Sequence, residues 1–216
     1  ALVGVWNRNF MHHPTVAVIP YSSVLARFPA HLQQCDMESN GKSIDRMGNR
    51  VKFETGPVIW GEPGTNAQHS FFQLIHQGTQ IIPLELIGAE NSQSGLDFEW
   101  KNTTSQQKLL SNFFAQGYAL ATGRKNDNPN KVFEGNRPSS FLIAKKITPY
   151  TLGALLSFYE NKIAFQGFIW GINSFDQEGV QLGKVLADQF LNLFEESDEK
   201  QESFAVGDSL LGVLKD

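Results

Sequence analysis

The stretch Val16-Ala17-Val18-Ile19-Pro20 joins four consecutive apolar residues to a proline. A short apolar run of this kind is typical of a strand that is buried on both faces, as the strands of parallel sheets are. Similar apolar runs recur at 56–60, 81–87 and 141–144. These four segments are the predicted strands.

Segments with apolar residues at helical spacing separate the predicted strands. They lie at 22–34, 71–75, 109–114 and 152–159. Short strands that alternate with amphipathic helices predict an α/β domain, with a mostly parallel sheet flanked by helices. One of these helices is expected to begin at the capping box Thr65-Asn66-Ala67-Gln68 and to end at Gly78.

The composition narrows the class of protein. With 216 residues, 41% of them hydrophobic and 19% charged, the chain can form the core of one large domain and is unlike a disordered protein. A net charge of -4 offers no basic face for nucleic acid, and no apolar run reaches the roughly 20 residues that a membrane span needs. The single cysteine, Cys35, excludes an internal disulfide, so the reducing cytoplasm is the expected compartment.

The two ends of the chain differ from its body. Residues 1–6 are mostly apolar and carry no leader pattern, so we interpret the chain as part of a longer protein. Residues 195–200 are charged or polar throughout. We therefore predict one domain over 1–194 and a C-terminal tail over 195–216.

Glu38 is the first candidate for chemistry. It follows a predicted helix and precedes the turn-forming pair Asn40-Gly41, which places it on an accessible loop. A carboxylate in this setting could act as a general base. From spacing alone, a solvated surface charge is the simpler interpretation.

His69 is expected in the first turn of the helix that begins near Thr65. The positive end of the helix dipole disfavours the imidazolium form, so a neutral ring there could accept or donate a proton. A histidine packed under the turn is the structural alternative. His12 and His13 lack a third ligand at metal spacing, so no metal site is predicted.

Gln177 and Lys184 are seven residues apart, which brings both side chains to one side of a helix. Near the start of that helix, the pair could hold an anionic ligand with several hydroxyl groups. An ordinary solvated helix face would show the same spacing.

Six segments of the chain change the balance between these alternatives, because together they resemble the glucose-6-phosphate isomerase family in the order in which the family carries them. They are Met37-Glu38-Ser39-Asn40-Gly41-Lys42, Trp60-Gly61-Glu62-Pro63-Gly64-Thr65-Asn66, Gln68-His69, Gln73-Leu74-Ile75-His76-Gln77-Gly78-Thr79, Phe133-Glu134-Gly135-Asn136-Arg137-Pro138 and 174–184. The last segment resembles the C-terminal signature of the family.

The resemblance implies a sugar-isomerase-type three-layer sandwich, the C-terminal part of a two-domain enzyme. It also implies a cytoplasmic enzyme of glycolysis and gluconeogenesis that interconverts glucose 6-phosphate and fructose 6-phosphate through a cis-enediol, without metal or cofactor. By matching motif, Glu38 is the base, and His69 and Lys184 assist opening of the sugar ring. Gln34 and Gln177 position the substrate.

The family resemblance further implies a homodimer in which His69 serves the partner's site. An arginine and a phosphate-binding loop of the family lie upstream of this chain, so we expect the chain alone to be inactive. Glu38 and the Gln177–Lys184 pair are expected to border a crevice at the C-terminal edge of the sheet. The alternative is a non-catalytic module that binds a phosphosugar or a receptor.

Overall fold

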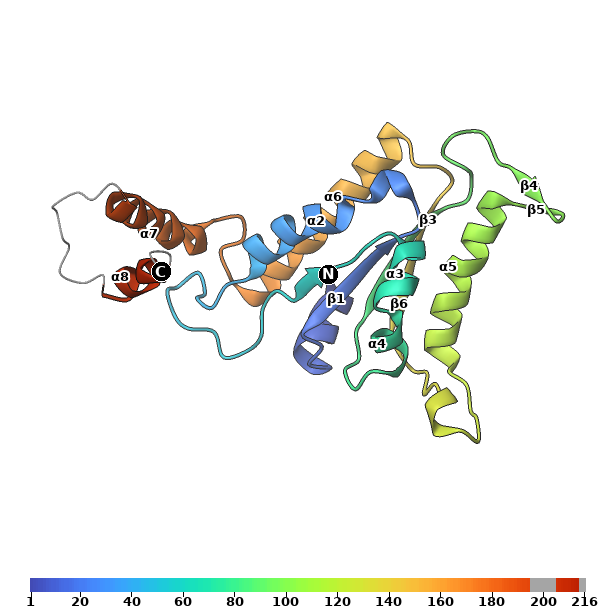
Figure 1. The fold of residues 1–216 in the computed structure, drawn as a ribbon, viewed down its shortest axis with the longest axis horizontal. Coiled ribbons are helices and arrows are strands. Elements are labelled where there is room, and N and C mark those ends of the chain that lie inside the picture. The colour runs from blue at the N-terminus through green and yellow to red at the C-terminus, as the bar shows by residue number, and fades with distance from the viewer. Residues whose placement is uncertain (195–204, 214–216) are drawn as a thin grey trace. The chain divides into compact units, whose positions relative to one another are not determined.

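The computed structural model describes residues 1–194 and 205–213, shown as a ribbon in Figure 1. These residues form two compact units, Ala1–Phe175 and Asp176–Asp216. The first unit holds the sheet, and the second holds α7 (Glu178–Phe194) and α8 (Ala205–Gly212). The domain boundary predicted after residue 194 stays a prediction, since the segment that follows it, 195–204, lies outside the described residues.

Four parallel strands form the sheet of the first unit, in the order β2-β1-β3-β6. They are β1 (Thr15–Pro20), β2 (Val58–Trp60), β3 (Leu84–Ala89) and β6 (Ser139–Ala144). In register, Val16 pairs with Ile59, Ile19 with Leu86, and Leu86 with Phe141. Each pair of parallel strands needs a crossover connection, and the segments between the strands supply the helices. The structure thus confirms the predicted α/β fold.

Helices cover both faces of this sheet (Figure 1). One face packs against α2 (Phe28–Leu32) and α6 (Pro149–Trp170), and the other against α3 (Gly64–Ser70), α4 (Phe72–Gln77) and α5 (Ser105–Thr122). Neighbouring residues of β1 serve opposite cores because side chains alternate along a strand. Val18 lies in the core with Phe28, Leu32 and Tyr159. Ile19 lies in the core on the opposite face.

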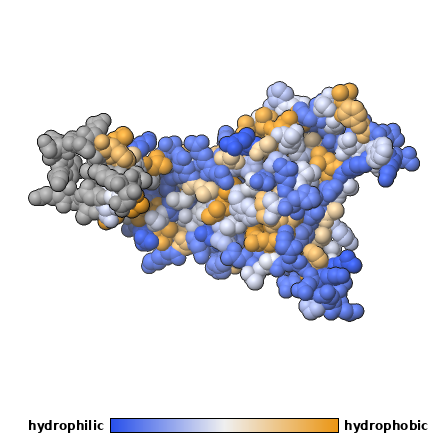
Figure 2. All heavy atoms as spheres, viewed as in Figure 1, coloured by the Kyte–Doolittle hydropathy of each residue, from blue (hydrophilic) through white to orange (hydrophobic). Residues whose placement is uncertain are grey.

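Short elements connect and extend these layers. The N-terminal segment folds as α1 (Leu2–Val5) and the π-helical η1 (Trp6–Phe10). A small antiparallel pair, β4 (Glu99–Trp100) and β5 (Thr103–Thr104), precedes α5, and the 3-10 turn η4 (Pro129–Lys131) lies before β6. Apolar side chains also reach the surface among polar ones on the face that Figure 2 shows.

The predicted helix at 22–34 is divided. It consists of the 3-10 turn η2 (Ser23–Leu25), then α2, then the π-helical segment η3 (Gln33–Glu38). Pro29 lies in the first turn of α2. A proline suits that position because its missing N–H needs no partner there, and it also prevents a continuous helix from running through it.

The predicted capping box at Thr65 is wrong. The helix begins earlier, at Gly64 after Pro63, no side chain caps it, and it breaks at Phe71 into α3 and α4. The early start has a packing reason, since a Cβ on Gly64 would lie 2.3 Å from the ring of Tyr21. The second helix does end at Gly78, which is extended at φ -70° and ψ 162° rather than left-handed.

A buried polar cluster joins η3, β3 and α6. Glu85 of β3 accepts hydrogen bonds from the hydroxyl of Tyr159 at 2.6 Å and from Nζ of Lys162 at 2.5 Å. Asp36 of η3 is buried as well, and it accepts a long bond of 3.4 Å from Asn40 Nδ2. Burial raises the pKa of Asp36 to about 6, because the loss of solvation outweighs the attraction of the Lys162 charge.

Replacement of Asp36 by asparagine should alter how stability depends on pH. Because the pKa of Asp36 is raised in the folded protein, the folded protein keeps this proton at pH values where the unfolded chain has already lost it. The favourable contribution of the protonated Asp36 to the free energy of unfolding is therefore complete below pH ~4 and is lost as the pH rises through about 6. Between pH 4 and 7, the free energy of unfolding of Asp36→Asn should therefore rise relative to wild type, by roughly 2–3 kcal/mol. Urea unfolding at several pH values measures this difference.

Asp97→Asn is the matched control for this experiment. Hydrogen bonds from the Thr104 side chain and the Gln106 backbone lower the pKa of the exposed Asp97 carboxylate. As the pH rises from acid values, the free energy of unfolding of the wild type should therefore increase relative to that of Asp97→Asn, which is the opposite direction. A difference between Asp36→Asn and wild type that stays constant from pH 4 to 7 would contradict the account of the buried carboxyl.

Candidate functional site

Glu38 lies on a helix and not on the accessible loop that the sequence predicted. It is the last residue of η3, and helical backbone continues through Ser39 and Asn40. Its side chain is half-buried. Single π-helical turns inside α-helices often occur at functional sites, because the extra residue displaces a side chain that a regular helix would carry elsewhere. Gln34 lies about one turn earlier, on the exposed surface of the same segment.

Long-range hydrogen bonds hold the end of this helix. The side-chain amide of Asn40 donates to the carbonyl of Ile163 in α6 at 3.1 Å. The Asn40 carbonyl accepts from the N–H of Gly56 at 2.9 Å, two residues before β2 begins. Glu38 therefore lies beside the N-terminal end of β2, and the expected position at the C-terminal edge of the sheet is wrong. The helix that starts after β1 runs back along the sheet, which carries its end to the opposite edge.

His69 lies in the last turn of α3, with its side chain exposed. The expected place in the first turn is wrong because the helix is short and begins at Gly64. His69 therefore does not lie at the positive end of the helix dipole, where the neutral ring was expected.

The turn before α3 sets the position of that helix. Gly61 adopts φ +154°, and a Cβ there would lie 1.9 Å from the carbonyl oxygen of Val18, so the chain passes β1 at a distance that only glycine permits. Gln68 then donates to the Tyr21 hydroxyl at 2.7 Å. These contacts place α3 on one face of the sheet, whereas α2 and η3 lie on the other (Figure 1).

Gln177 and Lys184 belong to the second unit. Gln177 comes directly before α7, and its carbonyl accepts from the N–H of Val180 at 3.1 Å. Lys184 lies within α7, and both side chains are exposed. Since they and Glu38 fall in separate units, a shared site stays a prediction.

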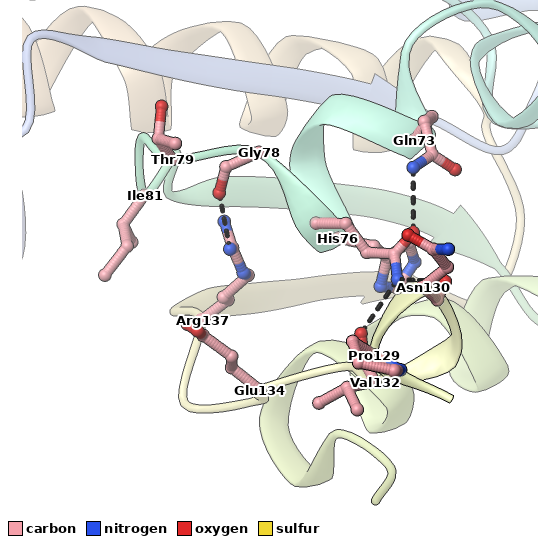
Figure 3. Close-up of a pocket in the computed structure, with 11 residues that line it drawn as sticks. Gln73, His76, Gly78, Thr79, Ile81, Pro129, Asn130, Val132, Glu134 and Arg137 are labelled. Atoms are coloured by element: carbon pink, nitrogen blue, oxygen red, sulfur yellow. Dashed lines mark hydrogen bonds between the residues drawn. The ribbon is translucent and has the colours of Figure 1, made fainter. Parts of the chain in front are cut away.

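The chain also forms a cavity of about 850 Å³ that none of the predicted site residues line (Figure 3). The buried guanidinium of Arg137 donates at this site to the carbonyls of Gly78 and Gln80, at 2.7 and 3.0 Å. The ring of His76 contacts Gln116 Oε1 at 2.9 Å. The motif segments 73–79 and 133–138 thus meet in space, a juxtaposition that could not be predicted from segments so far apart along the chain.

Metal-ligand clusters and membrane-spanning helices are both absent from the described parts of the chain. Within 1–194 and 205–213, histidine, cysteine, aspartate and glutamate side chains nowhere gather in groups of three that could hold a metal ion. No helix in these ranges has both the length and the apolar surface that a bilayer crossing needs.

Comparison with known proteins places these motifs in one family. A family model described as phosphoglucose isomerase matches residues 1–211. A glucose-6-phosphate isomerase of Protochlamydia amoebophila is 64% identical over 216 residues, which is 99% of this chain and 40% of the relative. The enzyme of that name from Desulfotalea psychrophila is 64% identical over 191 residues, 88% of this chain and 36% of the relative.

Solved structures agree with the sequence comparison. The crystal structure of a glucose-6-phosphate isomerase from Chlamydia trachomatis matches with a TM-score of 0.90 at 55% identity, over 99% of this chain and 40% of that one. A hypothetical protein from Thermus thermophilus matches with a TM-score of 0.69 at 28% identity, over 83% of this chain and 42% of that one. The chain spans about 40% of the length of such relatives, and it belongs to the phosphoglucose isomerase family.

Proposed function

We propose that the whole protein is a glucose-6-phosphate isomerase and that this chain supplies its general base, Glu38. The observation that carries the proposal is the position and partial burial of Glu38 in a chain that belongs to this family. The carboxylate is half-buried at the end of a π-helical turn whose position is fixed by the buried Asn40. A base must be held in place to take a proton from carbon, and this helix end provides such support.

The proposed reaction moves one proton between two carbons of the open-chain sugar. The Glu38 carboxylate takes the proton from C2 of glucose 6-phosphate, which leaves a cis-enediol with its double bond between C1 and C2. The same carboxyl group returns the proton to C1, while the hydroxyl proton on O2 is lost and O1 gains one. The product is fructose 6-phosphate, with its carbonyl at C2. Donors that stabilise the negative charge on oxygen during this transfer supply the largest rate effect.

His69 and Lys184 are the proposed groups for opening the sugar ring. To open the sugar ring, an acid must donate a proton to the ring oxygen while the proton of the C1 hydroxyl group is removed. His69 suits this role because an imidazole can accept or donate a proton and because its side chain is exposed on α3. Lys184 is the second group proposed to handle these protons, and Gln34 and Gln177 are proposed to position the sugar hydroxyls.

We propose that His69 acts in the partner's site of a cytoplasmic homodimer. Glu38 and His69 lie on helices that cover opposite faces of one sheet. This arrangement supports the proposal that the two side chains act in two different active sites of the dimer. In a two-fold dimer, each subunit then gives the same residue to the other. Exposed apolar residues of α6, among them Phe158, Phe165 and Phe168, offer surface for contacts with other parts of the protein.

Replacement of Glu38 by glutamine in the whole protein keeps the side-chain shape and removes proton acceptance. We expect kcat in a coupled isomerase assay to fall by roughly two to four orders of magnitude, the usual weight of a general base, with little change in substrate affinity. Glu90→Gln, an exposed carboxylate beyond the end of β3, is the matched control and should retain activity.

The isolated chain, with Glu38 intact, completes the comparison. It should give no measurable turnover, since it spans about 40% of the length of its relatives and the family resemblance implies that the arginine and the phosphate loop lie outside it. A kcat for Glu38→Gln close to wild type would exclude Glu38 as the base. Absence of turnover by the whole wild-type protein would instead favour the non-catalytic binding module.

Subunit exchange tests the position of His69. Dimers of Glu38→Gln and dimers of His69→Ala should each be nearly inactive. After the two are mixed and allowed to exchange, each mixed dimer should contain one site with both native residues, so activity should return to about half per mixed dimer. Native mass spectrometry of differently tagged subunits verifies that exchange occurs. No return of activity despite complete exchange would mean that His69 serves its own chain.

A further inference from the structure

Asn40 is fully buried, with 0% of its surface exposed, yet it is a polar residue at the end of the Glu38 helix. Its side-chain amide donates to the carbonyl of Ile163 and its Oδ1 accepts from the hydroxyl of Ser174 at 2.7 Å. Both ends of the carboxamide are therefore paired, as a buried polar group requires. The side chain thus joins the end of the Glu38 helix to two points more than 100 residues later in the sequence, Ile163 and Ser174.

Ser174 reaches Asn40 because α6 carries a glycine at the point of contact. A Cβ on Gly167 would lie 2.0 Å from Ser174 Oγ and 3.2 Å from Asn40 Oδ1. Any other residue at 167 would therefore displace the hydroxyl. The geometry at this point favours a direct contact between the end of the Glu38 helix and the chain that leaves α6.

A second contact holds the same turn. The N–H of Arg46 donates to the carbonyl of Gly171 at 2.8 Å, and Nε of Arg46 donates to the carbonyl of Ile172 at 3.1 Å. Ile172 itself is fully buried. The turn at 171–174 is thus bonded on both sides to the segment 40–46, which closely follows Glu38.

We propose that Asn40 and Ser174 are positioning residues that hold the end of the helix that carries Glu38. This inference rests on the proposed function of Glu38. Glu38 lies two residues before Asn40 on continuous helical backbone, so a shift of Asn40 would also move the Glu38 carboxylate. The hydroxyl of Ser174 pairs the Oδ1 end of the buried Asn40 carboxamide and thereby keeps this helix end in one place.

Ser174→Ala in the whole protein removes the hydroxyl and leaves the bond from Asn40 to Ile163 in place. We expect kcat to fall about tenfold, because small misplacement of reacting groups by a remote residue can cost up to about a hundredfold. Gly167→Ala disrupts the same contact from α6, so it should also lower kcat. Its further effect in a Ser174→Ala background should be smaller, since the hydroxyl that its Cβ displaces is then absent. Ser157→Ala, an exposed serine on the same helix, is the matched control and should keep kcat within about twofold of wild type, since exposed substitutions of this kind have small effects.

A double-mutant cycle separates positioning from a general loss of stability. If Ser174 acts through Glu38, then Ser174→Ala should lower kcat by less than about threefold in a Glu38→Gln background. The same tenfold loss in both backgrounds, or no loss in the wild-type background, would overturn the proposal. Failure of the proposed function has a different signature, namely full activity of Glu38→Gln.

Discussion

Burial of β1 on both faces is the constraint on which the rest of the first unit depends. Alternate residues of this strand, represented by Val18 and Ile19, face two separate cores. Each core needs its own helical layer, because an apolar sheet face cannot remain open to water. Parallel pairing of β1 with β2 and β3 then requires a crossover after each strand, and these crossovers supply the helices of both layers.

The positions of the candidate residues follow from this arrangement. The crossover after β1 carries Glu38 on one face, and the segment after β2 carries His69 on the other. The sheet itself therefore separates the proposed base from the proposed ring-opening acid within one chain. A site that uses both residues is easier to build from two copies of the fold than from one. This physical argument supports the dimer proposal independently of the family resemblance.

The four strands of the parallel sheet could be predicted from the sequence, whereas β4, β5 and the ends of the helices could not. Short apolar runs such as 16–19, which is followed by Pro20, favour a buried strand because they are too short for a buried helix. The start of α3 instead depends on the fit of Gly64 against Tyr21, a contact between residues far apart in the chain. A local capping pattern at Thr65 carries no information about such a contact, and the tertiary packing overrode it.

The candidate site shows the same division. The residue types at 38, 69, 177 and 184 pointed to chemistry only through the family resemblance, and their roles stay proposals. The π-helical turn at Glu38 could not be predicted from the local sequence, and the bond that holds the helix end after it joins Asn40 to Ile163, 123 residues away in sequence. The burial of Asp36, about one helical turn before Asn40, likewise depends on the tertiary structure and has no signal in the local sequence.

Proton transfer by Glu38 between C2 and C1 is the central claim, and isotope exchange tests it most directly. The whole protein is incubated with glucose 6-phosphate in heavy water, and the fructose 6-phosphate is analysed by NMR after many turnovers. A base that removes the C2 proton and returns a proton to C1 exchanges it in part with solvent, so deuterium should appear at C1. Rapid conversion with no deuterium at C1, however long the reaction runs, would contradict the claim, since it would mean that hydrogen passes directly between the two carbons.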